Sequence, residues 1–366
     1  MAAVDPDHVA QHYNAVPEKG VAERVKSRIF YLRNFNNWTK SMLIGEFLQK
    51  LEHNGIRHAT VLDLCCGKGG DLLKWKIGRI ERLVCADIAE VSLAQCEDRY
   101  REMLDRAKQE RRQNDLFTAE FISADCSKKR LREAYEQKDI RFDLCSCQFS
   151  LHYSFASEQQ ARRMLQNACE SLKPGGYFIG TLPDAARIFH CIKNAPADSA
   201  GKYANSVCSV EYEDKEGLSR GEQPPLFGAA FHFTLDEVVN CPEFLVHFPL
   251  LEKLLEEWNM ELVYKMRFPE AFDKFLKDSK EGRGLLGRMQ ALEPYPAEEE
   301  EDVTPMGDKS EYKTAEYNLS KLEEEQKDGG DSRRPIKIGT LSRSEWEVAS
   351  MYLVFAFRKK EDAPAV

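Results

Sequence analysis

The residues best suited to chemistry lie in two short stretches, TVLDLCCGKGGD (residues 60–71) and RLVCAD (residues 82–87). The first reads as a buried strand, a glycine-rich turn and the start of a helix. That order of elements lets backbone N–H groups approach a nucleoside-type cofactor. The second reads as a strand ending in Asp87, where a carboxylate can accept hydrogen bonds from both hydroxyls of a ribose. Each signal alone is weak, and together they predict a nucleoside-binding α/β domain.

The glycine turn differs from that of dinucleotide-binding proteins, which follow G-x-G-x-x-G and place a pyrophosphate at the start of the helix. Here the pattern is D-x-C-C-G-x-G-G, with Asp63 before the turn and Asp71 after it. A negative rim suits a pyrophosphate badly and a cofactor with a sulfonium and an ammonium group well. In these features the chain resembles the class I S-adenosylmethionine-dependent methyltransferases.

Cys65 departs from the pattern of that family, whose members usually carry Gly or Ala at this place. A Cβ and a thiol there crowd the space in which the amino-acid end of the cofactor would lie. One interpretation is a small and tolerated side chain, and the other is weakened cofactor binding. The sequence leaves both open.

Further candidates follow other predicted strands, because ligands of open α/β sheets bind beyond the carboxyl ends of the strands. Asp125 can accept the exocyclic amine of adenine, or it can cap the turn that follows. Gln148, His152 and Tyr153 follow the fourth predicted strand, and we expect their loop to face the substrate. A lone histidine is more often structural, but this one ends a strand beside a tyrosine.

The elements that must position these residues alternate along the chain. We predict a helix over residues 22–50, an amphipathic helix over 244–258, and strands over 60–64, 82–87, 120–124, 142–148, 176–181, 261–267 and 351–357. The alternation predicts an α/β fold with a doubly wound, mostly parallel sheet.

Two predicted insertions interrupt this domain, which we expect to span residues 21–358. The first, at about 194–233, is rich in Gly, Ser, Asp and Pro and predicts a lobe with some β character, and the second, at about 269–343, is charged and partly helical. We expect a flexible arm over 1–20 and a disordered tail over 359–366. The acidic stretch of the second insertion predicts a mobile solvated loop, and the alternative is a docking site for a basic partner.

The composition limits the function classes. No run of 18 apolar residues and no secretory signal is evident, so we expect no membrane partner. The eleven cysteines occur as C-C and C-x-C and never as C-x-x-C, which predicts reduced thiols and no metal site. The net charge of −9 is uneven, because residues 298–325 alone contribute −8. Residues 18–40 carry +4 and residues 68–82 carry +3, and these basic segments favour either a phosphate ligand or solvated helix faces.

Longer segments resemble the mRNA cap guanine-N7 methyltransferase family of the metazoan nuclear type, from about His12 to Phe357. The segments that carry this resemblance are HYN (12–14), SRIFYLRNFNNWTKS (27–41), LDLCCGKGGDLLKW (62–75), CSCQFSLHYSF (145–155), SLKPGGYFIGT (171–181), PEFLVHFPLL (242–251), MQALEPYPA (289–297), GTLSRSEWE (339–347) and YLVFAF (352–357). The resemblance implies a Rossmann-like, seven-stranded class I fold, S-adenosyl-L-methionine as cofactor, 5′-capped RNA as partner and a nuclear location. It also implies a small activator subunit as a further partner, for which the second insertion is the candidate site.

The resemblance also implies roles for individual residues. The cofactor site would use Lys40 for the methionine carboxylate, Cys65 through its backbone, and Asp87, Asp125, Gln148 and Tyr153. The cap site would use Asn36, Asn37, Lys68, Lys74, Arg99, His152, Glu243 and Tyr352. A carboxylate at Glu243 matches the N1–H and N2–H₂ donors of guanine, whereas the sequence alone favours an acid at a helix N-terminus.

Guanine N7 has an unprotonated lone pair at neutral pH, so we expect catalysis by positioning and electrostatics without a general base. Two alternatives remain. One is an enzyme of this fold with another substrate, and the other is a cap-binding or scaffold relative whose cofactor site is impaired by Cys65.

Overall fold

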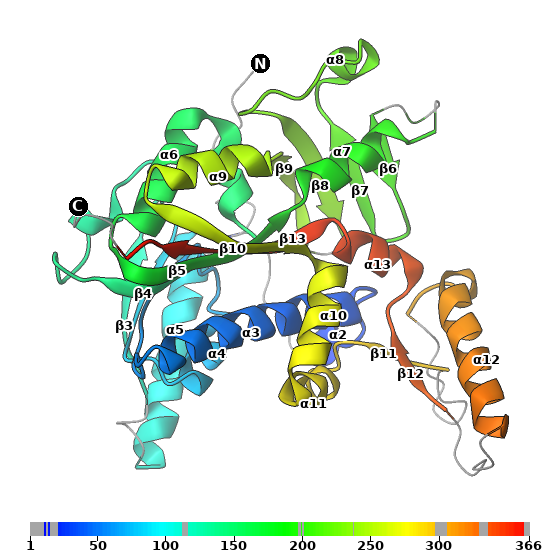
Figure 1. The fold of residues 1–366 in the computed structure, drawn as a ribbon, viewed down its shortest axis with the longest axis horizontal. Helices are drawn as coiled ribbons and strands as arrows, with labels where there is room; N and C mark the ends of the chain where they lie inside the picture. Colours follow the sequence, from blue (N-terminus) through cyan, green and yellow to red (C-terminus); the bar gives the residue numbers. More distant parts are fainter. Residues whose placement is uncertain are drawn as a thin grey trace.

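The computed structural model describes residues 11, 14, 21–111, 116–196, 199, 201–236, 238–296, 306–328 and 336–361. Its centre is a seven-stranded sheet in the order β10-β13-β5-β4-β1-β2-β3 (Figure 1). The strands are β1 (Thr60–Leu64), β2 (Arg82–Asp87), β3 (Thr118–Ser123), β4 (Phe142–Gln148), β5 (Leu172–Pro183), β10 (Met260–Arg267) and β13 (Tyr352–Lys359). The pairings from β3 to β5 are parallel, and β13 runs antiparallel to both of its neighbours. The predicted doubly wound, mostly parallel sheet is confirmed.

Helices cover both faces of this sheet because its central strands are apolar on both sides. One face packs against α3 (Phe30–His53), α4 (Leu72–Ile77) and α5 (Glu90–Gln109), and the other against α6 (Glu158–Cys169) and α9 (Phe248–Glu256) (Figure 1). Alternate residues of β1 serve the two cores, since Val61 faces α3 and Leu62 faces α6. Among the described residues, no helix is long and apolar enough to cross a bilayer.

The first insertion forms a four-stranded antiparallel sheet of β6 (Lys202–Ala204), β7 (Cys208–Tyr212), β8 (Ala230–Leu235) and β9 (Val239–Phe244). In the chain this sheet follows α7 (Ala185–Lys193), and the short helix α8 (Lys215–Ser219) lies between β7 and β8. The ladder between β8 and β9 extends this sheet to Phe244, beyond the expected limit of 233. The helix predicted over 244–258 therefore begins later, at Phe248.

The second insertion is mostly helical. It contains α10 (Phe268–Asp278), α11 (Lys280–Arg288), η5 (Lys309–Tyr312) and α12 (Lys313–Asp328), with a short ladder of β11 (Glu293–Tyr295) and β12 (Ile338–Thr340), and α13 (Arg343–Ala349) leads back to the sheet. In Figure 1 α12 lies at the far edge of the molecule from the parallel strands. The expectation of a loop over the acidic stretch is wrong for residues 309–325, which lie in η5 and α12. Residues 297–305 and 329–335 lie outside the described residues, so the expected mobility there stays a prediction.

Several expected boundaries were wrong. The first helix is divided into α2 (Val21–Arg24) and α3, and β3 and β5 begin before their predicted starts. The tail does not begin at residue 359, because Lys359 ends β13, is buried and donates a hydrogen bond to the Cys169 carbonyl over 2.8 Å. Among residues 1–20 only positions 11 and 14 are described, and 362–366 lie outside the described residues, so the arm and the rest of the tail stay predictions.

Candidate active site

Asp87 is held at the carboxyl end of β2 by the glycine turn. The Gly67 N–H donates to one of its carboxylate oxygens over 2.7 Å, and the Ala89 N–H donates to the other over 2.8 Å. Gly67 and Gly69 have φ values of 52° and 73°, a region that favours glycine. Burial, followed by the charge of the Cys65 thiolate, raises the pKa of Asp87 to about 7. The turn therefore fixes a carboxylate beside its own backbone, as a ribose-binding residue requires.

Cys65 adopts the left-handed conformation, with φ of 57°. A non-glycine residue in this region costs about 1–2 kcal/mol. Its thiol accepts hydrogen bonds from the thiols of Cys126 and Cys147, which lower the pKa of Cys65 despite its burial. The negative charge of Asp125 acts to raise the pKa of Cys65, and His152 acts to lower it. Cys65 thus lies among the residues predicted for the cofactor.

A cluster of charges surrounds the end of the glycine turn. Lys40 Nζ and Lys74 Nζ each lie 2.8 Å from Asp71 Oδ1, and Lys74 also donates to Asn37 Oδ1 over 2.6 Å. Burial acts to raise the pKa of Asp71, but the two ammonium groups outweigh it and lower the pKa to about 2. Two cations against one anion leave a charge of +1 where an anionic ligand group would meet the turn.

The proposed negative rim of the turn is wrong. Asp71 is buried between two lysines, and Asp63 is buried in the core, where its carboxylate accepts a hydrogen bond from Trp75 Nε1 over 3.1 Å. Burial raises the pKa of Asp63 well above its usual value. The physical reason is strand alternation, which turns the side chain of Asp63 toward the helices and away from the open edge of the sheet.

Asp125 caps the turn after β3. Its Oδ1 accepts hydrogen bonds from the Ser127 N–H over 2.9 Å and from the Ser127 hydroxyl over 2.6 Å. Its Oδ2 lies 3.5 Å from Lys128 Nζ. The capping interpretation is confirmed, and contact with adenine stays a prediction that concerns Oδ2, a buried oxygen without a hydrogen-bond partner among the described residues.

Glu243 joins the small sheet to the loop after β4. It lies on β9, and its Oε1 accepts a hydrogen bond from the Tyr153 hydroxyl over 3.3 Å. His152 Nε2 lies 3.4 Å from Glu243 Oε2, and the rings of His152 and Tyr153 are 4.2 Å apart. The interpretation of Glu243 as an acid at a helix N-terminus is wrong, because α9 begins five residues later, at Phe248.

The polar atoms of this group are buried and incompletely paired. His152 is 2% exposed and Glu243 is 3% exposed. Among the described residues, neither ring nitrogen of His152 has a hydrogen-bond partner, and Glu243 Oε2 accepts no hydrogen bond. Unsatisfied buried polar atoms cost free energy, so a ligand that donates to the carboxylate would stabilise this arrangement.

An aromatic wall is formed by the rings that contact Tyr352. The ring of Tyr352, at the start of β13, contacts Phe149 at 5.2 Å, Phe268 at 5.8 Å and Phe233 at 6.4 Å between centroids. Phe149 has φ of 57°, and its N–H donates to the Thr181 carbonyl. The sequence analysis missed Phe149 as part of the site. Phe149 directly follows Gln148 at the end of a predicted strand, and this position could have indicated a site residue. Its positive φ could not be predicted from the sequence.

The other predicted residues come from β4, α3, the glycine turn and α5. Gln148 donates to Ser146 over 3.1 Å, while its Oε1 is buried without a hydrogen-bond partner among the described residues. Asn36 on α3 has a buried side-chain oxygen in the same condition. Lys68 belongs to the glycine turn, and Arg99 lies on α5, where its charge acts on Cys96. The structure thus joins Lys40, Asn37 and Lys74 in one cluster and His152, Tyr153 and Glu243 in another.

Comparison with known proteins identifies the family of this chain. Residues 3–360 match the family model described as an mRNA (guanine-N(7))-methyltransferase domain. The chain is 49% identical to the mRNA cap guanine-N(7) methyltransferase of Caenorhabditis elegans, over 96% of this chain and 87% of that one. It is 42% identical to that of Drosophila melanogaster, over 96% and 76%. A solved S-adenosylmethionine-dependent methyltransferase from Clostridium acetobutylicum aligns with a TM-score of 0.41 and 15% identity, over 63% of this chain and 83% of that one. The chain belongs to the mRNA (guanine-N(7))-methyltransferase family.

Proposed function

We propose that this chain transfers a methyl group from S-adenosyl-L-methionine to N7 of the guanosine cap of mRNA. The observation that carries the choice of acceptor is Glu243, a buried carboxylate with an unpaired oxygen beside His152 and Tyr153. Guanine presents two adjacent N–H donors on its Watson–Crick edge, and a carboxylate accepts both. Family membership supports the same acceptor.

The residues present fit the cofactor. Asp87, fixed by two backbone N–H groups, would accept the ribose hydroxyls, and Lys40 would meet the methionine carboxylate. Asp125 would accept the adenine amine through Oδ2, which is buried and has no hydrogen-bond partner among the described residues, while Gln148 and Tyr153 would border the methyl-transfer face. When bound, S-adenosylmethionine would supply a methyl group activated by a sulfonium.

The chain's own contribution is position and electrostatics. Glu243, His152 and Tyr352 would hold the guanine plane, and Asn36, Asn37, Lys68, Lys74 and Arg99 would border the triphosphate and the guanosine. Alignment of two reactants supplies about 7–11 kcal/mol of a barrier. No proton leaves N7, so His152 and Tyr153 position the base and transfer no proton. Buried carboxylates stabilise the positive charge that passes to the purine.

The proposed setting is the nucleus, with 5′-capped RNA as the substrate. The second insertion is the proposed docking surface for a small activator subunit, because α12 projects from the sheet and leaves Tyr317 57% and Leu322 40% exposed. A pull-down with and without residues 306–328 tests that assignment.

The test of the reaction is methyl transfer from labelled cofactor to RNA that ends in GpppG, followed by nuclease digestion. We expect the label in 7-methylguanosine. RNA that ends in a plain triphosphate is the control and should remain unlabelled. Label in an internal nucleotide or in the control RNA would contradict the proposal.

A second candidate function is favoured by one observation, the left-handed conformation of Cys65. Strain and crowding at that position are compatible with a cap-binding relative whose cofactor site is impaired. Calorimetry separates the two, because such a relative binds a cap analogue and fails to bind S-adenosylmethionine.

A further inference from the structure

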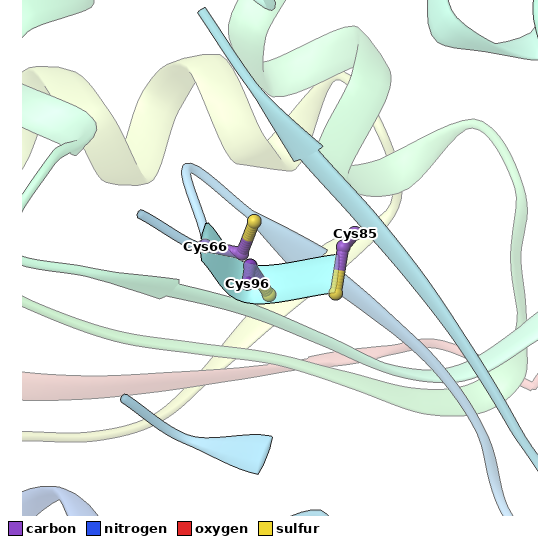
Figure 2. A group of neighbouring side chains, drawn as sticks. All are labelled: Cys66, Cys85 and Cys96. Carbon is purple, nitrogen blue, oxygen red and sulfur yellow. The ribbon is translucent and has the colours of Figure 1, made fainter. Parts of the chain in front are cut away.

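Three thiols meet directly beneath the glycine turn. Figure 2 shows Cys66 from the turn, Cys85 from β2 and Cys96 from α5. Their sulfur atoms all lie within 4.8 Å of one another. Cys85 and Cys96 are buried, and Cys66 is partly exposed. We call these three residues the thiol cluster.

The thiol cluster supports the groups that hold Asp87. Cys66 immediately precedes Gly67, whose N–H donates to Asp87 over 2.7 Å. Cys96 lies beneath the turn, since a Cβ added at Gly69 would lie 2.7 Å from its sulfur. Cys66 and Cys96 therefore both border the turn that holds Asp87, and a bond between them would act directly on that turn.

One member of the cluster is predisposed to react. Hydrogen bonds from Cys66 and then from Cys85 lower the pKa of Cys96 to about 4, and the Arg99 guanidinium acts in the same direction. The thiolate is the nucleophilic form of cysteine, and oxidation-sensitive thiolates lie next to a second thiol that can resolve the first product.

A metal ion explains the cluster less well. Within the described part of the chain, the group contains no carboxylate or imidazole that would complete a tetrahedral set. Three thiolates and a divalent ion would also leave a net negative charge in the core, close to the buried carboxyl of Asp63. A disulfide is neutral and adds no such cost.

We propose that Cys66 and Cys96 form a disulfide when the chain meets hydrogen peroxide, and that this bond weakens cofactor binding. The second part rests on the proposed function. The Cys96 thiolate attacks one peroxide oxygen, so that an S–O bond forms, the O–O bond breaks and the hydroxide released takes a proton to become water. The Cys66 sulfur then attacks the Cys96 sulfenic acid, and a second water leaves with the proton of the Cys66 thiol.

Cys66 is the resolving partner because it lies in the glycine turn, outside any helix or strand. Cys85 is fixed within β2, where its neighbours on β1 and β3 are Asp63 and Phe121. Closing a disulfide brings two sulfur atoms to about 2.05 Å, and we expect the Cys66 backbone to shift toward α5 as the bond closes. That shift draws the Gly67 N–H away from Asp87 and disturbs the proposed ribose site.

The experiment treats the full chain with hydrogen peroxide and blocks the remaining thiols. Non-reducing peptide mapping then reports the disulfide, and calorimetry with S-adenosylmethionine reports affinity before treatment, after it and after dithiothreitol. We expect a peptide that joins Cys66 to Cys96 and an affinity loss of about tenfold or more that dithiothreitol reverses. Cys66→Ser should lose this response. In that variant no Cys66 thiol can resolve the first product, so trapping with dimedone should reveal sulfenic acid at Cys96.

Two further substitutions serve as controls. Cys169→Ser, a buried cysteine on the other face of the sheet, should keep the full response. Cys65→Gly should also keep it, because Cys65 belongs to the separate thiol group with Cys126 and Cys147.

The proposal is wrong if mapping finds no Cys66–Cys96 peptide, or if Cys65→Gly abolishes the response while Cys66→Ser retains it. Stoichiometric zinc or copper in the untreated chain, released in Cys66→Ser, would also overturn it in favour of a metal site. Failure of the untreated chain to bind S-adenosylmethionine would contradict the proposed function instead, since peptide mapping reports the disulfide independently.

Discussion

At the scale of single residues, the site depends on buried polar groups that are fixed but not saturated. Asp87 is held by two backbone N–H groups, and Glu243 is held by one hydroxyl. Each of these buried carboxylates can still accept a hydrogen bond from a ligand. Such groups cost stability in the free chain and gain it when the ligand binds, which links their pairing to recognition.

Replacing Glu243 by Gln tests recognition of the guanine. The amide keeps the volume and the Tyr153 contact but presents a donor where guanine needs an acceptor. We expect methyl transfer to fall by at least about 100-fold, since a site built to pair a donor rejects a mismatch strongly. Calorimetry with the cofactor alone should show unchanged affinity. A variant with normal turnover on capped RNA would remove Glu243 from the site.

Replacing Cys65 by Gly tests whether this chain is impaired. Glycine accepts φ of 57° without strain and removes the thiol, so cofactor affinity should rise, by up to about tenfold for each 1.4 kcal/mol relieved. Cys65→Ala is the matched control, because it removes the thiol but keeps the Cβ in the left-handed region. Affinity for a cap analogue should stay unchanged. Equal or weaker cofactor affinity in Cys65→Gly would show that the chain has adapted to the thiol.

The raised pKa of Asp87 predicts how cofactor binding depends on pH. Burial raises this pKa to about 7, so the free chain holds a neutral carboxyl below pH 7, whereas ribose hydroxyls bind best to the ionised form. Affinity should therefore rise with pH up to about 7, by up to tenfold per unit, and then level. Asp87→Asn should bind weakly at every pH. Calorimetric affinity that stays flat from about pH 5.5 to 7.5 in the parent chain would contradict this assignment.

At the scale of elements, strands with apolar runs could be predicted closely. The observed bounds of β1, β2 and β4 equal the predicted ones, because each is a buried parallel strand between clear turn signals. Contacts across the fold could not be predicted this way. The sequence analysis placed Glu243 in the site only through family resemblance, since nothing local says that β9 pairs with β8 and reaches His152.

The same limit applies to the second insertion, which Arg28 helps to attach. Arg28 Nη2 donates to Glu311 over 3.2 Å and to Ser342 over 3.0 Å, and Nη1 lies 3.4 Å from the fully buried Glu345. These partners follow Arg28 by about 280 to 320 positions in the chain, a separation that no periodicity can bridge. Arg28 therefore connects the turn before α3 to η5 and α13.

Replacing Arg28 by Met tests that connection. The two buried carboxylates lose their cationic partner but keep hydrogen bonds from Leu32, Ser342 and Ser344. We expect a loss of about 2–4 kcal/mol in the free energy of unfolding, somewhat less than for a fully buried pair because Arg28 is 22% exposed. Urea denaturation measures it. Arg101→Met, which breaks an exposed pair with Glu97, should cost no more than about 1 kcal/mol. Equal effects of the two substitutions would contradict the structural role of Arg28.

At the scale of the whole molecule, charge is separated. The net charge is −9, yet basic residues gather around the glycine turn and the start of α3, while the acidic run lies in the second insertion. A chain of this charge attracts RNA only where the local field is positive. The distribution suits the short polyphosphate of a cap better than a long RNA track.

Salt dependence tests this view. Affinity for capped RNA should fall gently between 50 and 200 mM salt, compared with the loss of about 10³–10⁵ expected for 6–10 phosphate contacts. The measurement compares a cap dinucleotide with capped RNAs of increasing length. Equal slopes are expected, and a slope that steepens with length would show that the RNA body is also bound.

The most direct test of the account replaces the acceptor atom itself. Two capped RNAs are compared, one with guanosine at the cap and one with 7-deazaguanosine, which has the same shape and Watson–Crick edge but a C–H group in place of N7. We predict that labelled methyl is transferred to the first RNA only, while the second competes for binding with similar affinity. Methyl transfer to the 7-deazaguanosine cap, or none to either RNA in the presence of bound cofactor, would contradict the account.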